Sequence, residues 1–167
     1  RHRPAAAPLT VVCCANMAAN GDTLRRLLLH YADLVDPALA RRIADGIGFP
    51  NTMVDRIVPA ATPESLAWAE ARLGVRDEAA IVCEPFTQWV IEDRFTGPRP
   101  AWEDAGALLT DDVRPYQAMK LRLLNGTHSA IAYLGQLRHR ATVSDAMADP
   151  ALSAFVRALE DALSGRP

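Results

Sequence analysis

Three polar side chains, closely spaced within one apolar run, carry most of the chemical information in this sequence. Lys120, Asn125 and His128 stand at positions i, i+5 and i+8. On an ideal α-helix, at about 100° per residue, they point near 0°, 140° and 80° and share one broad face. Leu121 and Leu124 project into the same arc, so we expect this face to be buried. Burying a lysine is costly unless it is paired or neutral, so the pattern indicates chemistry.

These residue types suit the interconversion of an alcohol and a carbonyl without a metal. An amine held away from water can exchange a proton near neutral pH. The amide N–H of Asn125 can stabilise a developing alkoxide, and His128 can hold a hydroxyl. Gly126 allows a backbone or a ligand to approach closely. The alternative is an ordinary amphipathic helix whose lysine reaches water along its stem and whose histidine satisfies a core hydrogen bond.

The element that positions the three side chains is a long helix, which we expect from Pro115 to about Gly135. The rest of the sequence predicts a mainly α fold with a few short strands. The apolar, β-branched run at 9–14 is typical of a buried strand in a parallel sheet whose other strands lie elsewhere. Further helices are predicted at 22–35, 36–47, 62–73 and between 145 and 163, and further strands at 53–58, 80–83 and 88–91.

Composition excludes several classes of function. The 167 residues suffice for one domain with a core, and the net charge of −2 offers no basic surface for nucleic acid. The sequence has no apolar stretch long enough for a bilayer and no secretory signal, so we expect no membrane partner. Three cysteines, two of them adjacent, do not form a disulfide framework, and without a Cys/His motif we predict no metal site. Reduced thiols favour a cytoplasmic location. The chain lacks an initial methionine, and we expect it to be part of a longer protein.

The spacing Lys-x4-Asn-x2-His resembles the signature of the long-chain polyol-specific dehydrogenases, the mannitol dehydrogenase family, which includes mannonate (fructuronate) oxidoreductase. The likeness runs from about residue 9 to about residue 155, and several other motifs agree in order. They are Cys14-Ala15-Asn16 with Asn20-Gly21, Phe49-Pro50-Asn51-Thr52-Met53-Val54-Asp55-Arg56-Ile57, Glu84-Pro85-Phe86 with Gln88-Trp89-Val90-Ile91-Glu92-Asp93, and Pro115-Tyr116 with Met119-Lys120.

The resemblance implies a role for each residue of the motif. Lys120 would be the general base in alcohol oxidation and the general acid in carbonyl reduction. Asn125 and Asn16 would form the oxyanion hole, and His128 would orient the substrate. The substrate would be a polyol or a sugar acid, of the mannitol/fructose or mannonate/fructuronate type.

The resemblance also implies a domain organisation. Val54 and Asp55 would line the sugar site, and NAD would be held by an amino-terminal Rossmann-type domain. Residues 1–21 would be the last strand and turn of that domain. Residues 22–167 would form a helical substrate domain similar to the C-terminal domain of 6-phosphogluconate dehydrogenase, with further substrate-binding residues expected beyond Pro167.

Two positions depart from the family pattern. Gln117 stands three residues before the lysine, where the family often has an acidic residue that exchanges protons with solvent. An amide cannot carry a proton in that way. Ala15 replaces the acidic residue of the Cys-Asp-Asn turn that would position Asn16.

The 167 residues contain no Gly-rich dinucleotide fingerprint. We therefore assign no cofactor-binding residue and expect the chain alone to bind NAD weakly or not at all, without turnover. The leading hypothesis is part of a metal-independent, NAD-dependent polyol or sugar-acid dehydrogenase. The alternative is a non-catalytic helical interaction module derived from that family.

Overall fold

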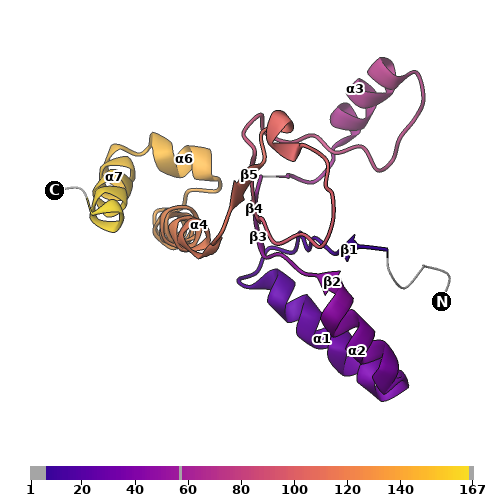
Figure 1. Cartoon of the computed structure of the whole chain (residues 1–167). Coiled ribbons are helices and arrows are strands. Elements are labelled where there is room, and N and C mark those ends of the chain that lie inside the picture. The colour runs from indigo at the N-terminus through magenta and orange to yellow at the C-terminus, as the bar shows by residue number, and fades with distance from the viewer. Residues whose placement is uncertain (1–6, 57, 166–167) are drawn as a thin grey trace. The chain divides into compact units, whose positions relative to one another are not determined.

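The structure, a computed structural model, describes residues 7–56 and 58–165 of the chain. Contacts between residues divide it into two compact units, Arg1–Val113 and Arg114–Pro167. The domain boundary expected after residue 21 stays a prediction. Figure 1 shows the elements of each unit.

Short strands, three α-helices and one short 3₁₀ helix make up the described part of the first unit. Its elements are β1 (Leu9–Thr10), α1 (Asn20–Val35), α2 (Pro37–Gly46), β2 (Ile47–Gly48), β3 (Thr52–Asp55), α3 (Pro63–Leu73), β4 (Gln88–Glu92), the short helix η1 (Trp102–Ala105) and β5 (Leu108–Thr110). The mainly helical class with a few short strands is confirmed.

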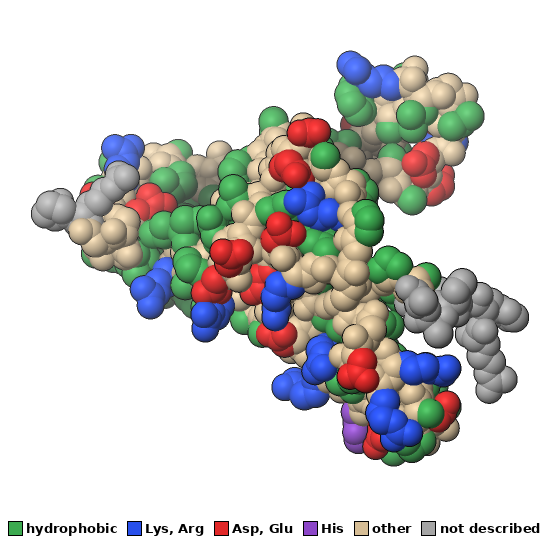
Figure 2. Space-filling view, viewed as in Figure 1, with side chains coloured by type: hydrophobic (Ala, Val, Ile, Leu, Met, Phe, Trp, Pro, Cys, Tyr) green, Lys and Arg blue, Asp and Glu red, His purple; other side chains and the backbone are tan. Residues whose placement is uncertain are grey.

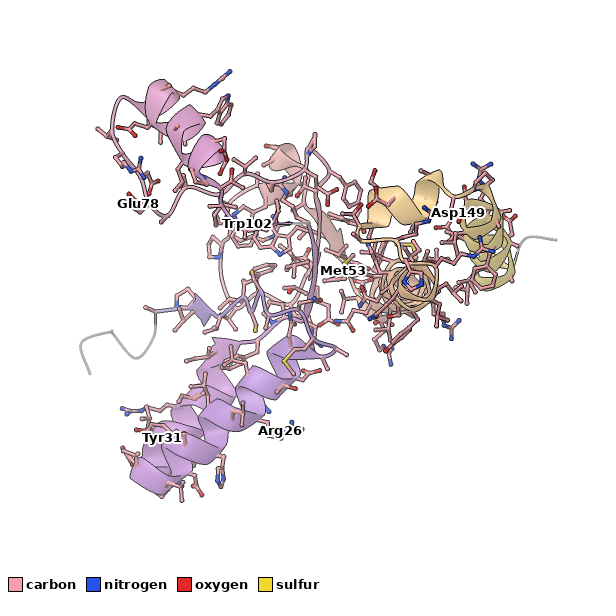
Figure 3. The ribbon with its side chains drawn as sticks, turned by 180° about the vertical axis from the view of Figure 1, so that it is seen from behind. Arg26, Tyr31, Met53, Glu78, Trp102 and Asp149 are labelled. Carbon is pink, nitrogen blue, oxygen red and sulfur yellow. The ribbon has the colours of Figure 1, made fainter. Side chains whose placement is uncertain are left out.

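A three-stranded sheet in the order β3-β4-β5 forms the centre of this unit. β3 and β4 are antiparallel, and β4 and β5 are parallel. The sheet is anchored by Val90 and Ile91, which are completely buried, and by Met53 on β3, which Figure 3 labels. Apolar residues on both faces of β4 explain why this short strand lies in the middle.

A second, two-stranded sheet pairs β1 with β2 in parallel. The predicted strand at 9–14 is therefore parallel, but its paired part is only Leu9–Thr10. In the sequence, α1 and α2 lie between β1 and β2, and the two helices run side by side (Figure 1). Asp36 caps α2, and its carboxylate accepts a hydrogen bond from the N–H of Ala38 at 2.9 Å. α1 begins at Asn20, two residues before the predicted start at residue 22.

Within residues 114–165, the second unit contains helices and no strand. It contains α4 (Arg114–Met119), the wide-turned helix η2 (Lys120–Gly126), α5 (Thr127–Leu137), α6 (Val143–Ala148) and α7 (Pro150–Ser164). Its core is a small cluster of Ile131, Ala146, Leu152 and Val156. The predicted long helix is present as α4, η2 and α5.

Three strand assignments differ between the sequence prediction and the structure. Residues 80–83 form no strand, whereas β2 and β5 were not predicted and pair with β1 and β4. The apolar run at 80–83 resembles a strand locally, but Ile81 and Val82 are exposed and gain no partner strand that would bury them. Pairing with a distant segment decides such cases, because short apolar runs have no strong preference of their own.

Among the described residues, no helix has the length and apolar character needed to cross a membrane. Figure 2 shows acidic and basic side chains intermingled over α1 and α2, without a continuous basic surface there.

Candidate functional site

Three of the predicted site residues lie on the helical rod of the second unit. Pro115 stands in the first turn of α4, where its missing N–H has no helical partner to lose. Lys120 then opens the segment η2, which has the i→i+5 hydrogen bonding of a π-helix, and Asn125 lies near its end. His128 follows in the first turn of α5. π-helical segments are rare and are frequent at functional sites.

The π-helical geometry changes where these side chains point. A wide turn holds about 4.1–4.4 residues, so each residue rotates by roughly 82–88° instead of 100°. Counted through η2 into α5, Lys120, Asn125 and His128 fall within an arc of about 80°. An ideal α-helix would spread them over about 140°. The extra width therefore gathers the three groups on a narrower face than the sequence alone predicts.

The side chains on this face are more exposed to solvent than the sequence predicts. Lys120 is half-buried, whereas Asn125 and His128 are exposed. Leu121 is 66 % exposed, so the prediction of a buried face is wrong for this chain. The physical reason is that the small core of the second unit uses other positions of the rod, chiefly Ile131.

His128 is oriented by its own helix. Its Nδ1 lies 3.1 Å from the main-chain oxygen of Leu124, which can only accept, so Nδ1 donates. In the neutral ring, the lone pair of Nε2 then remains as an acceptor on the exposed side. This tautomer is suited to accepting a hydrogen bond from a hydroxyl.

Lys120 also stands out by composition, because it is the only lysine among the 167 residues and the other 17 basic residues of the Lys+Arg total of 18 are arginines. Arginine stays charged at all ordinary pH values, whereas an amine can exchange its proton. The only side chain of this kind in the chain thus stands at the position assigned to the base.

The remaining predicted residues lie in the first unit. Asn16 is exposed on the turn that follows β1, in which the N–H of Met17 donates to the oxygen of Ala15 at 2.9 Å. Val54, half-buried, and Asp55 lie on β3, where they pair with Trp89 and Gln88 of β4. The side chain of Asp55 lies outside the described part.

Lys120, Asn125 and His128 thus lie on consecutive segments of one helical run, and Asn16, Val54 and Asp55 all belong to the other unit. Their assignment to a site remains a prediction. Sequence reasoning did not assign a role to Asn20, which is buried and is hydrogen-bonded both to the Asn16 turn and to β3. The Asn20-Gly21 pair was noted only as a motif, although a polar residue beside a glycine is a signal for a close approach of two segments.

An ion pair between Glu92 and Arg94 lies near β3. Glu92 is buried, and its Oε2 pairs with Arg94 and accepts a hydrogen bond from the N–H of Asn51 at 3.0 Å. The carboxylate is therefore used to hold the chain that leads into β3.

On metals, no group of three or more His, Cys, Asp or Glu side chains that could bind an ion lies within residues 7–56 and 58–165. The three cysteines are free. Burial raises the pKa of the Cys14 thiol, and the neighbouring Cys13 raises it further. This keeps Cys14 a thiol rather than a nucleophilic thiolate.

The fit of a nicotinamide cofactor is partial. In open α/β sheets, cofactors bind beyond the carboxyl ends of parallel strands. The Asn16 turn follows the carboxyl end of β1, which is parallel to β2. The sequence lacks the Gly-rich turn that binds a pyrophosphate. The described residues thus include a strand end of the kind beside which cofactors bind, but the sequence has no turn of the type that binds the phosphates.

Comparison with known families gives two matches. Residues 1–104 match the family model described as the mannitol dehydrogenase Rossmann domain. Residues 112–163 match the model described as the mannitol dehydrogenase C-terminal domain. The boundary between these matches lies close to the division of the structure after Val113.

Individual relatives are similar over most of this chain. The uncharacterized oxidoreductase YdfI of Escherichia coli is 53% identical over 150 residues, 89% of this chain and 31% of that protein. The D-mannonate oxidoreductase of the same organism is 51% identical over 142 residues, 85% of this chain and 29% of that protein. The chain thus spans about a third of the length of these relatives.

A solved structure shows the same fold. It is the Pseudomonas fluorescens mannitol 2-dehydrogenase in a ternary complex with NAD and D-mannitol. The TM-score is 0.75 at 44% sequence identity, and the match covers 91% of this chain and 31% of that one.

Proposed function

The chain belongs to the mannitol dehydrogenase family, and from this we propose that it forms part of an oxidoreductase that transfers a hydride between NAD and a polyol or sugar acid. The resemblance expected from its motifs is thereby confirmed. The substrate class we propose is that of the mannitol/fructose or mannonate/fructuronate pairs. The three free cysteines support a reducing, cytoplasmic location.

The observation that carries this proposal is the π-helical segment η2. It begins at the only lysine of the chain and gathers Lys120, Asn125 and His128 within an arc of about 80°. A base, an amide donor and a hydroxyl acceptor in such an arc can all reach one carbinol group. This arrangement has no evident use in an interaction module.

The chemistry follows from these groups. In alcohol oxidation, the Nζ of Lys120 takes the hydroxyl proton, and in carbonyl reduction it returns that proton. The family resemblance assigns the side-chain N–H groups of Asn125 and Asn16 as donors to the oxygen that becomes negative, and such donors lower the barrier without reorganisation. Nε2 of His128 accepts a hydrogen bond from a neighbouring hydroxyl. Val54 and Asp55 line the sugar site.

NAD supplies the hydride acceptor or donor when bound. The chain contributes the Asn16 turn beside its reactive end, and the phosphates require residues outside these 167. Gln117, three positions before Lys120, cannot relay the proton as a carboxylate would, so Nζ must exchange its proton by another route, such as water.

The test is substitution of Lys120 in the protein that joins this chain to the nicotinamide-binding segment of its relatives. We expect Lys120→Ala to lower turnover by about 10²–10⁴-fold, because the general base is lost. Added primary amines should restore part of the rate. The measurement is NADH formation from mannitol and from mannonate.

Arg122→Ala is the matched control. Arg122 is an exposed cation of the same π-helical segment, two residues further on and so on the opposite face of the helix. Its removal should change turnover by less than about twofold, as expected for an exposed charge. Unchanged turnover in Lys120→Ala would show that Lys120 is not the general base.

A further inference from the structure

Asn20 is, with Thr52, one of the two most deeply buried polar side chains described in the first unit, and the proposed chemistry has no use for it. Only 1 % of its surface is exposed, although it begins a helix. A buried amide is costly unless each of its polar atoms is hydrogen-bonded. Its partners therefore show what it holds in place.

The amide nitrogen of Asn20 holds the turn after β1. Nδ2 donates to the main-chain oxygens of Cys13 at 3.0 Å and Ala15 at 2.9 Å. These residues lie three positions and one position before Asn16 in the sequence. The same nitrogen lies 2.9 Å from the hydroxyl of Thr52, which itself donates to the oxygen of Cys13 at 2.6 Å.

The amide oxygen of Asn20 binds the start of β3 and the N–H of the next residue. Oδ1 accepts from the N–H of Thr52 at 2.9 Å and from the N–H of Gly21 at 2.8 Å. Thr52 is the first residue of β3, the strand that carries Val54 and Asp55. One side chain thus connects two segments more than thirty residues apart, as the separation of 32 between Asn20 and Thr52 shows.

The close approach of these segments depends on Gly21. A Cβ at this position would lie 2.3 Å from the main-chain oxygen of Pro50. Only glycine therefore allows the start of α1 to lie against the chain that leads into β3. The Asn-Gly pair is required as a unit, since one residue permits the contact and the other forms its hydrogen bonds.

We propose that Asn20 is a positioning residue of the substrate site, which fixes the turn that carries Asn16 to the start of the strand that carries Val54 and Asp55. The inference rests on the function proposed above. An oxyanion donor is effective only when it is held in place before the reaction, and Asn16 lies exposed on a turn. The two carbonyl contacts of Asn20 hold that turn from inside.

Asn20→Asp separates this role from general stability. The aspartate keeps the oxygen that accepts from Thr52 and Gly21 but loses the N–H donors, and at neutral pH its carboxylate repels the carbonyl oxygens of Cys13 and Ala15. Asn51→Asp is the matched control. Asn51 is also buried, but its Nδ2 donates to the carboxylate of Asp22 at 2.8 Å instead of to the turn.

The first measurement uses the 167-residue chain itself. In Asn20→Asp, the NMR order parameters of the amides of Ala15, Asn16 and Met17 should fall from about 0.85 toward about 0.6. In Asn51→Asp they should stay near the original values. Unchanged order parameters in Asn20→Asp, or an equal fall in both variants, would overturn the proposal.

The second measurement is kinetic and uses the chain joined to the nicotinamide-binding segment. Asn20→Asp should lower kcat by about tenfold to a hundredfold with KM within about twofold, because an oxyanion donor acts in the transition state. A rise in KM alone would contradict the proposal. Lys120→Ala in the same assay separates the two ideas: if it abolishes turnover while Asn20→Asp does not lower kcat, only this inference fails.

Variants of Thr52 decide the matter if Asn20→Asp does not fold. Thr52→Val removes the hydroxyl that donates to Cys13, and Thr52→Ser keeps it. We expect the valine variant to show the mobile turn and the lower kcat, and the serine variant to restore both. If the two folded variants show the same order parameters and the same kcat, the positioning role proposed for Asn20 is wrong.

Discussion

The carboxylate of Asp149 accepts hydrogen bonds from two arginines. Its oxygens accept from Arg138 at 3.0 Å and from Arg140 at 3.1 Å, and one of them also accepts from the N–H of Ala151 at 3.0 Å (Figure 3 labels Asp149). Asp149 is buried and caps α7. The residue therefore joins the chain after α5 to the start of α7.

This network predicts a dependence of stability on pH. Hydrogen bonds from Arg138, and then from Arg140, lower the pKa of Asp149 from 3.8 to about 2. The folded state thus binds this proton less readily than the unfolded state. Its stabilisation is fully present above about pH 4 and is lost as the pH falls through about 2.

We expect Asp149→Asn to flatten that dependence. Asparagine is as good a helix cap as aspartate, so the substitution removes the charge and keeps the cap. The midpoint of thermal unfolding should be lower than in the parent at pH 5 and should fall less between pH 5 and pH 2. Asp161→Asn, at an exposed position of the same helix, is the control. A parallel pH dependence in Asp149→Asn and the parent would show that the ion pairs contribute nothing.

At the scale of the element, η2 is the feature that most affects the proposed chemistry. Its seven residues, Lys120–Gly126, rotate less per residue than those of the α-helices on either side. The accumulated difference is about one residue. A π-helical segment of this length therefore corresponds to an α-helix with one residue inserted.

Two single-residue deletions test whether turnover depends on Lys120, Asn125 and His128 lying on one helix face. Either deletion should return the segment to α-helical width. Deleting Leu121 leaves Asn125 about 40° from Lys120, whereas deleting Gly126 leaves it about 140° away, and His128 stays near the lysine in both. In the enzyme joined as above, we expect turnover within about tenfold for the first and a loss of about 10²–10³-fold for the second. Equal losses at equal helical content by circular dichroism would show that the arc is irrelevant.

At the scale of the whole molecule, the chain spans 31% of the length of its mannitol 2-dehydrogenase relative of known structure. Binding of a dinucleotide depends on a Gly-rich turn and a helix N-terminus that hold the pyrophosphate. The 167 residues contain no such turn. The proposed residues therefore supply the chemistry for the substrate but not the binding energy for the cofactor.

We accordingly expect no turnover by the chain alone. The purified 167 residues, mixed with mannitol or mannonate and NAD, should form no NADH above background, and calorimetry should detect no tight NAD binding. Joining the nicotinamide-binding segment of a relative should restore both. NADH formation by the chain alone would show that the site is complete within it.

The family and the main helices could be predicted from the sequence because they depend on local signals. Thr62 caps α3 through its side chain, and Pro37 opens α2, as such residues do in most helices. The three-residue motif identified the family because its chemistry requires certain residue types at fixed spacing. The prediction of a strand at 80–83 is wrong because strand formation depends on a partner strand that the local sequence does not specify.

The sequence by itself determined which side chains are available for chemistry: one lysine, and an asparagine and a histidine at set distances from it. The structure decided how they point, since the i→i+5 hydrogen bonds of η2 bring them into a narrower arc than ideal helical spacing allows. It also revealed that Asn20 joins the Asn16 turn to β3. That contact links residues far apart in the chain, and the local Asn20-Gly21 pattern does not specify which distant segment is the partner.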